Sequence, residues 1–200
     1  MNTFNTFKIS LLALFFTACA HAPVPASFGF YGRRCIPVTE VVCMADKDMS
    51  VAFCEGPVHA AVAIVNEALG QDRLHFSGTV PASVENLVAG LNKEQIIVYG
   101  DTLQPGVAGL TLAKSAKKAP SPDCLGPTVV MIDKAFTTYD SRAQQYALAV
   151  IIHEMLHSIG AEHAPSRGAY HSIMTPALQD PSWANHITVF DRAALRTAYP

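Results

Sequence analysis

The residues able to do chemistry in this chain are concentrated in an eleven-residue stretch from His153 to His163, which holds three histidines. His153 and His157 are four positions apart, so on a helix their rings project from one face and can share one ion. Gly160 suits the left-handed end of that helix, after which His163 can turn back toward the pair. Three neutral imidazoles bind zinc at ~2.0–2.1 Å and leave the fourth position to water, as in catalytic sites. We therefore predict one catalytic Zn²⁺ bound by His153, His157 and His163.

Glu154 directly follows the first of these histidines and falls beside the pair. A bound zinc ion lowers the pKa of its water toward ~7 and polarises a carbonyl group. Glu154 is then placed to take the proton as general base and to deliver it to a leaving amine. The predicted chemistry is hydrolysis of an amide bond, with Glu154 as the catalytic residue.

The extended pattern His-Glu-x-x-His-x-x-Gly-x-x-His resembles the motif of the metzincin zinc endopeptidases. Residues 172–176 (Ser-Ile-Met-Thr-Pro) are similar to the Met-turn of that family, which puts a methionine, here Met174, beneath the metal. The proline two places after Met174 and the final segment, residues 191–199, resemble those of the matrixins within the family. Ala164 and Thr175 depart from the matrixin pattern, so the resemblance does not extend to the wall of the specificity pocket.

This resemblance implies an α+β, zincin-like fold: a twisted, mostly parallel sheet of four to five strands, an active-site helix and a small C-terminal subdomain. It also implies a zinc-dependent endopeptidase whose protein or peptide substrate pairs with the edge strand of the sheet, either residues 109–113 or the strand near Glu94. A structural Ca²⁺ or a second Zn²⁺ is compatible with the family, but no residue cluster supports one. Two other functions stay open: a zinc amidase acting on cell-envelope peptides, and a non-catalytic zinc-binding envelope lipoprotein.

The first twenty residues have the pattern of an export signal: Lys8, then an apolar run over residues 9–16, then small residues. The run is far shorter than the ~20 residues that a membrane-spanning helix needs. Residues 16–19 (Phe-Thr-Ala-Cys) resemble a lipobox, in which Cys19 becomes lipidated, whereas cleavage after Ala20 would give a soluble secreted protein.

These patterns divide the chain into a signal peptide (residues 1–20), a tether (residues 21–34) and a metzincin-like catalytic domain (residues 35–200). We expect an exported protein, held at the outer membrane or periplasmic face of the cell envelope, whose only membrane contact is a lipid on Cys19. Two hundred residues, half of them apolar, suit one domain. A net charge of −2 without a basic face excludes a nucleic-acid partner.

Four cysteines remain once Cys19 is set aside, an even number that in an exported chain predicts two disulfide bonds. Three connectivities are open to them. The four candidates are Cys35, Cys43, Cys54 and Cys124.

Hydrophobic periodicity predicts the elements around the motif. Residues 36–42 are at best an edge strand or an irregular arm, because Pro37 cannot donate a ladder hydrogen bond. Pro57 suits the first turn of a helix that ends at Gly70. Helices are expected over residues 57–69, 142–159 and 191–199, and strands over residues 74–80, 94–99, 109–113 and 129–132.

Overall fold

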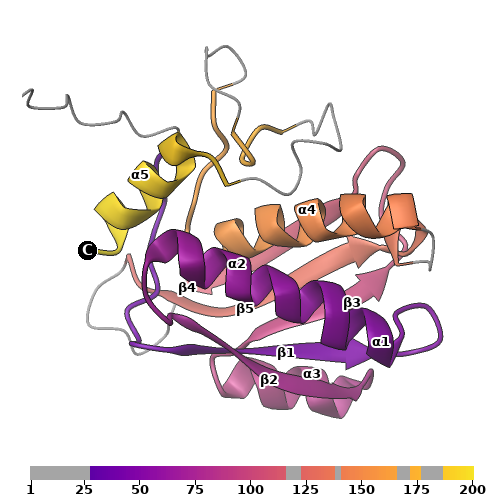
Figure 1. The fold of residues 1–200 in the computed structure, drawn as a ribbon. Helices are drawn as coiled ribbons and strands as arrows, with labels where there is room; N and C mark the ends of the chain where they lie inside the picture. Colours follow the sequence, from indigo (N-terminus) through magenta and orange to yellow (C-terminus); the bar gives the residue numbers. More distant parts are fainter. Residues whose placement is uncertain (1–27, 116–122, 138–140, 166–171, 177–186) are drawn as a thin grey trace, which may run out of the picture.

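A five-stranded mixed sheet forms the centre of the protein (Figure 1). The computed structural model describes residues 28–115, 123–137, 141–165, 172–176 and 187–200. The strands lie in the order β2-β1-β3-β5-β4; β2, β1, β3 and β5 run parallel, and β4 pairs antiparallel with β5 at the edge. Their bounds are β1 Thr39–Ala45, β2 Leu74–Pro81, β3 Ile96–Asp101, β4 Gly109–Ser115 and β5 Leu125–Asp133. Of the two segments predicted as the edge, residues 109–113 are therefore the correct one, and the strand near Glu94 is internal.

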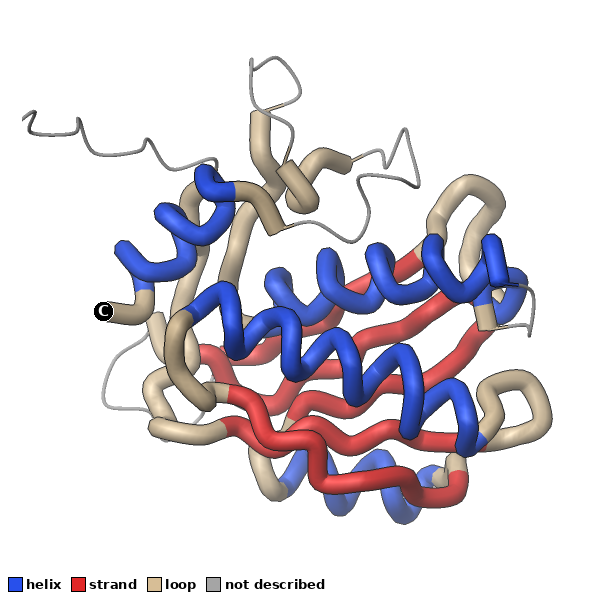
Figure 2. Tube along the Cα trace, viewed as in Figure 1, coloured by secondary structure: helices blue, strands red, loops and turns tan. Residues whose placement is uncertain are grey.

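Helices cover both faces of this sheet (Figure 2). The long helix α4 and helix α2 lie side by side on one face, and α3 lies on the other. Helix α5 packs against α2 near the end of the chain. The helical bounds are α1 Val51–Phe53, η1 Cys54–Val58, α2 His59–Leu69, α3 Val84–Asn92, η2 Lys134–Phe136, α4 Ser141–Ser158 and α5 Val189–Ala198.

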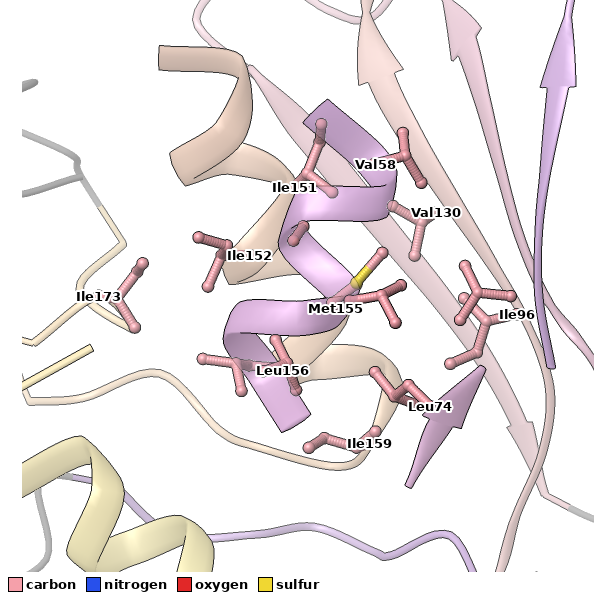
Figure 3. Close-up of a cluster of buried hydrophobic side chains, with 14 of the residues drawn as sticks. Val58, Leu74, Ile96, Val130, Ile151, Ile152, Met155, Leu156, Ile159 and Ile173 are labelled. Atoms are coloured by element: carbon pink, nitrogen blue, oxygen red, sulfur yellow. The ribbon is translucent and has the colours of Figure 1, made fainter. Parts of the chain in front are cut away.

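Helix α4 runs through the core and is apolar around most of its circumference (Figure 3). Ile151, Ile152 and Leu156 are all 0% exposed. A helix surrounded in this way must be covered on several sides, here by α2, by the sheet and by the turn that contains Ile173. Each such side chain contributes roughly 1.5–3 kcal/mol by its burial. The end of α4 that carries the histidines is therefore rigidly placed.

The helix predicted to begin at Pro57 begins six residues earlier in the structure. Ser50 is its N-cap and accepts a hydrogen bond from the Phe53 N–H at 3.1 Å. The proline lies within the five-residue π-helical segment η1, which joins α1 to α2. A proline has no N–H to donate, so a local widening of the helix accommodates it. The predicted end at Gly70 is confirmed, with a φ of 74°.

Strand β1 is internal to the sheet, so the prediction of an edge strand or irregular arm for residues 36–42 is wrong. It pairs with β2 on one side and with β3 on the other. Pro37 precedes the strand, so none of its ladder hydrogen bonds is lost. Helix α3 was not predicted; it is short, contains Gly90, and is marked in the sequence mainly by its N-cap, Ser83.

The two predicted disulfide bonds are present, and their connectivity is Cys35–Cys124 and Cys43–Cys54. The sequence predicts that residues 28–34, which we name the N-terminal arm, belong to a tether. The structure shows otherwise. They pack on the domain, with Phe28 and Arg34 only 6% and 4% exposed. The signal peptide, the rest of the tether and Cys19 lie outside the described residues.

In the described part of the chain, no helix combines the length and apolar character needed to cross a membrane. After His163 the described residues comprise the turn at 172–176 and helix α5. The small C-terminal subdomain stays a prediction, because residues 166–171 and 177–186 lie outside the description.

Candidate metal centre and active site

The three histidines of the motif converge on one point at the end of α4. The Nε2 atom of His157 lies 3.1 Å from that of His153 and 3.0 Å from that of His163, and the third distance is 3.3 Å. They form the one group of potential metal ligands found among the described residues. Three Nε2 atoms bound to one tetrahedral zinc ion at ~2.0–2.1 Å lie roughly 3.3 Å apart, close to the arrangement observed.

The hydrogen bonds of the rings fix which nitrogen faces that point. The Nδ1 atom of His153 lies 2.7 Å from the Ile173 carbonyl oxygen, and that of His157 lies 2.7 Å from the Ala161 carbonyl oxygen. A carbonyl only accepts, so each Nδ1 carries the proton and each Nε2 presents a bare lone pair. Burial lowers the pKa of His153 to about 4 and also lowers that of His157, which favours the neutral, ligating form. Unprotonated nitrogens facing one another repel unless a cation lies between them, so this donor set fits a metal ion.

The end of α4 directs the third histidine toward the pair. Gly160 has a φ of 102° and is the left-handed residue of a Schellman motif. Its N–H donates to the His157 carbonyl at 2.9 Å, and the next N–H, of Ala161, donates to the Leu156 carbonyl at 3.0 Å. The predicted role of Gly160 in turning the chain is confirmed, and His163 arrives three residues later.

The turn that contains Met174 supports two of the three ligands through its backbone. The Ile173 carbonyl orients His153, and the Met174 carbonyl accepts from the Ala164 N–H at 2.8 Å, next to His163. Met174 itself is 0% exposed. Its predicted position beneath a metal ion stays a prediction. The structure shows that its backbone is hydrogen-bonded to the residue next to His163.

Asp191, near the start of α5, anchors this turn, and its role was not predicted. The carboxylate is 0% exposed and accepts from the Ser172 hydroxyl at 2.6 Å and from the Thr188 N–H at 2.9 Å. Asp191 and Thr188 form a capping box at the N-terminus of α5. Their spacing, Thr-x-x-Asp, is the sequence signal that could have identified it.

Strand β4 positions Glu154 from the side of the sheet. The Thr111 hydroxyl lies 2.6 Å from Oε2 of Glu154 and 2.9 Å from its backbone oxygen. Gly109 is so close that a Cβ there would lie 2.7 Å from Cγ of Glu154. Burial raises the pKa of the Glu154 carboxyl to about 7, and the hydrogen bond from Thr111 opposes that rise. These β4 contacts were not predicted from the sequence.

A cavity of about 790 Å³ opens over these groups. The three histidines and Glu154 line it, together with residues of β4 and the apolar side chains of Phe136, Tyr146 and Val150. Thr175 and Pro176 form part of its wall, as does Tyr31 of the N-terminal arm. The arm brings Tyr31 into the site, whereas the sequence had placed this residue in a tether.

Comparison with known proteins adds a fold and no family. No family model matches the chain, and no curated protein matches it. A chain in a solved structure described as the GM1-bound form of the ECX AB5 holotoxin is similar to it, with a TM-score of 0.50 and 12% sequence identity. The likeness covers 82% of this chain and 80% of that one. At this identity it shows a shared fold only.

The assignment to the matrixin-like metzincins is therefore wrong as a recognition. No family model matches the chain, and one similar solved structure, at 12% sequence identity, is described as a holotoxin. The motif that suggested it determines a local ligand geometry over eleven positions, and Ala164 and Thr175 already departed from the matrixin pattern. The chain thus shares the fold of that holotoxin chain, and the chemistry of its histidine cluster follows from its own residues.

Proposed function

We propose that this protein is a zinc-dependent endopeptidase in which His153, His157 and His163 hold one Zn²⁺ and Glu154 is the general base. The observation that carries the proposal is the convergence of the three histidine Nε2 atoms, 3.0–3.3 Å apart, beside a buried carboxylate in an open cavity. A structural metal site would be closed by a fourth protein ligand. No fourth histidine, cysteine or acidic side chain joins the cluster among the described residues.

Zinc bound by these ligands would supply a Lewis acid that acidifies water and polarises a carbonyl. Glu154 does the proton transfer: its carboxylate accepts a proton from the attacking water and returns it to the leaving amine. Thr111 holds Oε2 of this carboxylate, so that Oε1 is left for the water. The carbonyls of Ile173 and Ala161 keep the protons of His153 and His157 on the nitrogens that face away from the cluster.

The cavity supports a peptide as substrate. Strand β4 ends the sheet order and contributes Gly109, Leu110, Thr111 and Ala113 to the cavity. An extended peptide can pair with the free edge of such a strand, which would lay its backbone along the cavity. The apolar side chains at the cavity wall suit burial of a substrate side chain.

The disulfide bonds are compatible with an exported protein, since such bonds persist in oxidising compartments. We propose further that Cys19 is lipidated and that the protein is held at the cell envelope. Replacement of Cys19 by serine should move the protein from the detergent phase to the aqueous phase on detergent partitioning. Partitioning of wild type into the aqueous phase would refute lipid anchoring and would leave the hydrolytic proposal untouched.

The experiment that tests the function incubates purified protein with a denatured protein and, separately, with cell-envelope peptides. The proposal predicts cleavage of the denatured protein by wild type and none by Glu154→Gln, with equal zinc in both. Cleavage of the envelope peptides alone would replace the endopeptidase by an amidase. Loss of a cellular phenotype in His157→Ala but not in Glu154→Gln would favour a non-catalytic zinc protein.

A further inference from the structure

The N-terminal arm runs antiparallel to the loop that brings the third histidine to the site. Phe30 forms an antiparallel bridge with Ala161. The Tyr31 N–H donates to the Gly160 carbonyl at 2.9 Å, and the Glu162 N–H donates to the Gly29 carbonyl at 2.9 Å. The arm thus binds this loop on both sides of Ala161, directly before His163.

The fit between arm and loop is tight enough to require a glycine. A Cβ on Gly160 would lie 2.0 Å from the Gly32 carbonyl oxygen. A Cβ on Gly32 would in turn lie 2.9 Å from the Asp123 carbonyl oxygen. The arm is therefore packed between the Gly160 turn and the segment at Asp123, with no room for a side chain at either glycine. Gly160 therefore leaves space for the arm and also ends helix α4.

His163 is the ligand that most needs such support. His153 and His157 are fixed by α4 and by their Nδ1 hydrogen bonds, whereas His163 is exposed and lies in a loop. The backbone on its two sides is held by Glu162 bonding to the arm and by Ala164 bonding to Met174. Removal of the arm would leave only one of these two attachments.

The arm is itself anchored at its C-terminal end. The Cys35–Cys124 disulfide ties it to the start of β5, and Arg33 exchanges backbone hydrogen bonds with Asp123 and Leu125 at 3.0 and 2.9 Å. The Arg34 guanidinium is buried and donates to the Ser158 carbonyl at 3.1 Å, in the last turn of α4. The Tyr31 hydroxyl donates to the His157 carbonyl and its side chain lines the cavity.

We propose that the N-terminal arm is a positioning element of the metal centre. By pairing with residues 160–162 it holds His163 at the distance at which its Nε2 atom meets those of His153 and His157. The Cys35–Cys124 disulfide and the Tyr31 hydroxyl keep the arm in that place. This inference rests on the proposed metal site and adds a part of the chain that the histidine motif does not contain.

The test compares two double variants of the full exported chain. Cys35→Ser with Cys124→Ser removes the disulfide that anchors the arm. Cys43→Ser with Cys54→Ser removes the other disulfide and is the matched control. The zinc dissociation constant is measured by competition with a chromophoric chelator, beside the melting temperature of each metal-free protein. Groups that orient metal ligands typically change metal affinity 10–100-fold when removed. We expect weakening of about that size in the first variant only, while both variants lose thermal stability.

Tyr31→Phe keeps the proposal testable if the first variant does not fold. It removes one hydroxyl and should weaken zinc binding about fivefold, which corresponds to the net contribution of one hydrogen bond. The visible spectrum of bound Co²⁺ should change in the arm variants, because it responds to loss of the third imidazole, and should stay unchanged in the control.

Zinc affinity within twofold of wild type in both arm variants, or equal weakening in the Cys43 and Cys54 control, would overturn the positioning role. Absence of zinc binding in wild type would overturn this inference together with the proposed metal site. Tight zinc binding by wild type without any hydrolysis would overturn the proposed function alone, and the arm comparison would still be decided by its dissociation constants.

Discussion

Replacement of Gly109 by alanine should disable Glu154 without removing the metal ligands. The added Cβ would lie 2.7 Å from Cγ of Glu154, 2.7 Å from Cγ1 of Val150 and 2.9 Å from Oε1 of Glu154. Carbon atoms in contact keep about 3.5–4.0 Å, so the carboxylate must move by roughly 1 Å. A displacement of ~1 Å at a reacting group can cost about 100-fold in rate. We therefore expect kcat to fall about 100-fold, with the zinc dissociation constant unchanged.

The assay is steady-state cleavage of a peptide, run beside zinc titration and thermal melting. Gly90→Ala is the matched control, because its Cβ would lie 2.7 Å from Cδ1 of Ile97 on the opposite face of the sheet. It should lose stability by roughly 1–3 kcal/mol, as overpacked sites do, and keep its kcat. Gly56→Ala meets no atom within 4 Å and should be neutral or slightly stabilising. A kcat for Gly109→Ala within threefold of wild type would refute the claim that this contact positions Glu154.

Three further predictions concern the supports of the site. Thr111→Val removes the hydroxyl that binds Oε2 of Glu154 and should lower kcat about 10-fold with KM little changed. Thr111→Ser should retain most of the activity. Equal losses in the two variants would contradict the hydrogen-bond role. Asp191→Ala leaves the buried Ser172 hydroxyl and nearby N–H groups without this acceptor. It should lower the free energy of unfolding, measured by urea denaturation, by about 3 kcal/mol. A loss under 1 kcal/mol would show that the turn does not depend on Asp191. Removal of metal by a chelator should abolish hydrolysis and lower the melting temperature, and one equivalent of Zn²⁺ should restore both; full activity after chelation would refute metal dependence.

The ligand cluster was predictable from the sequence because its geometry is local. The spacing of His153 and His157 is converted into proximity by any helix, and a left-handed glycine turns the chain back toward them. The helix around them was predictable for the same reason, since its apolar residues recur over many turns. The disulfide count followed from an even number of cysteines, although their pairing depended on the tertiary fold.

The contacts that come from distant parts of the chain were not predictable. Gly109 and Thr111 meet Glu154 only because β4 joins the sheet as an antiparallel edge. The sequence of the N-terminal arm predicts a tether because Pro23, Pro25 and Gly29 interrupt a stretch with little hydrophobic periodicity, and its aromatic residues have no spacing that indicates where they pack. Pro37 suggests an edge strand only if it lies within the strand, whereas β1 begins two residues after it.

The resemblance to the metzincins is wrong as a family assignment for a related reason. An eleven-residue pattern constrains the geometry of ligands and not ancestry, and a solved chain that shares the fold is only 12% identical to this one. The chemistry of the histidine cluster does not depend on that assignment. It follows from the carbonyl groups that hold the Nδ1 protons of His153 and His157 and from the convergence of the three ligand nitrogens.

In the proposed mechanism the histidine cluster holds one zinc ion, and Glu154 acts beside it as the general base in peptide hydrolysis. The most direct measurement is zinc content and cleavage of a mixed peptide library by wild type and by Glu154→Gln, purified in parallel. We expect one zinc per chain in both proteins and cleavage by wild type alone. Wild type without zinc, or equal cleavage by the two proteins, would contradict it.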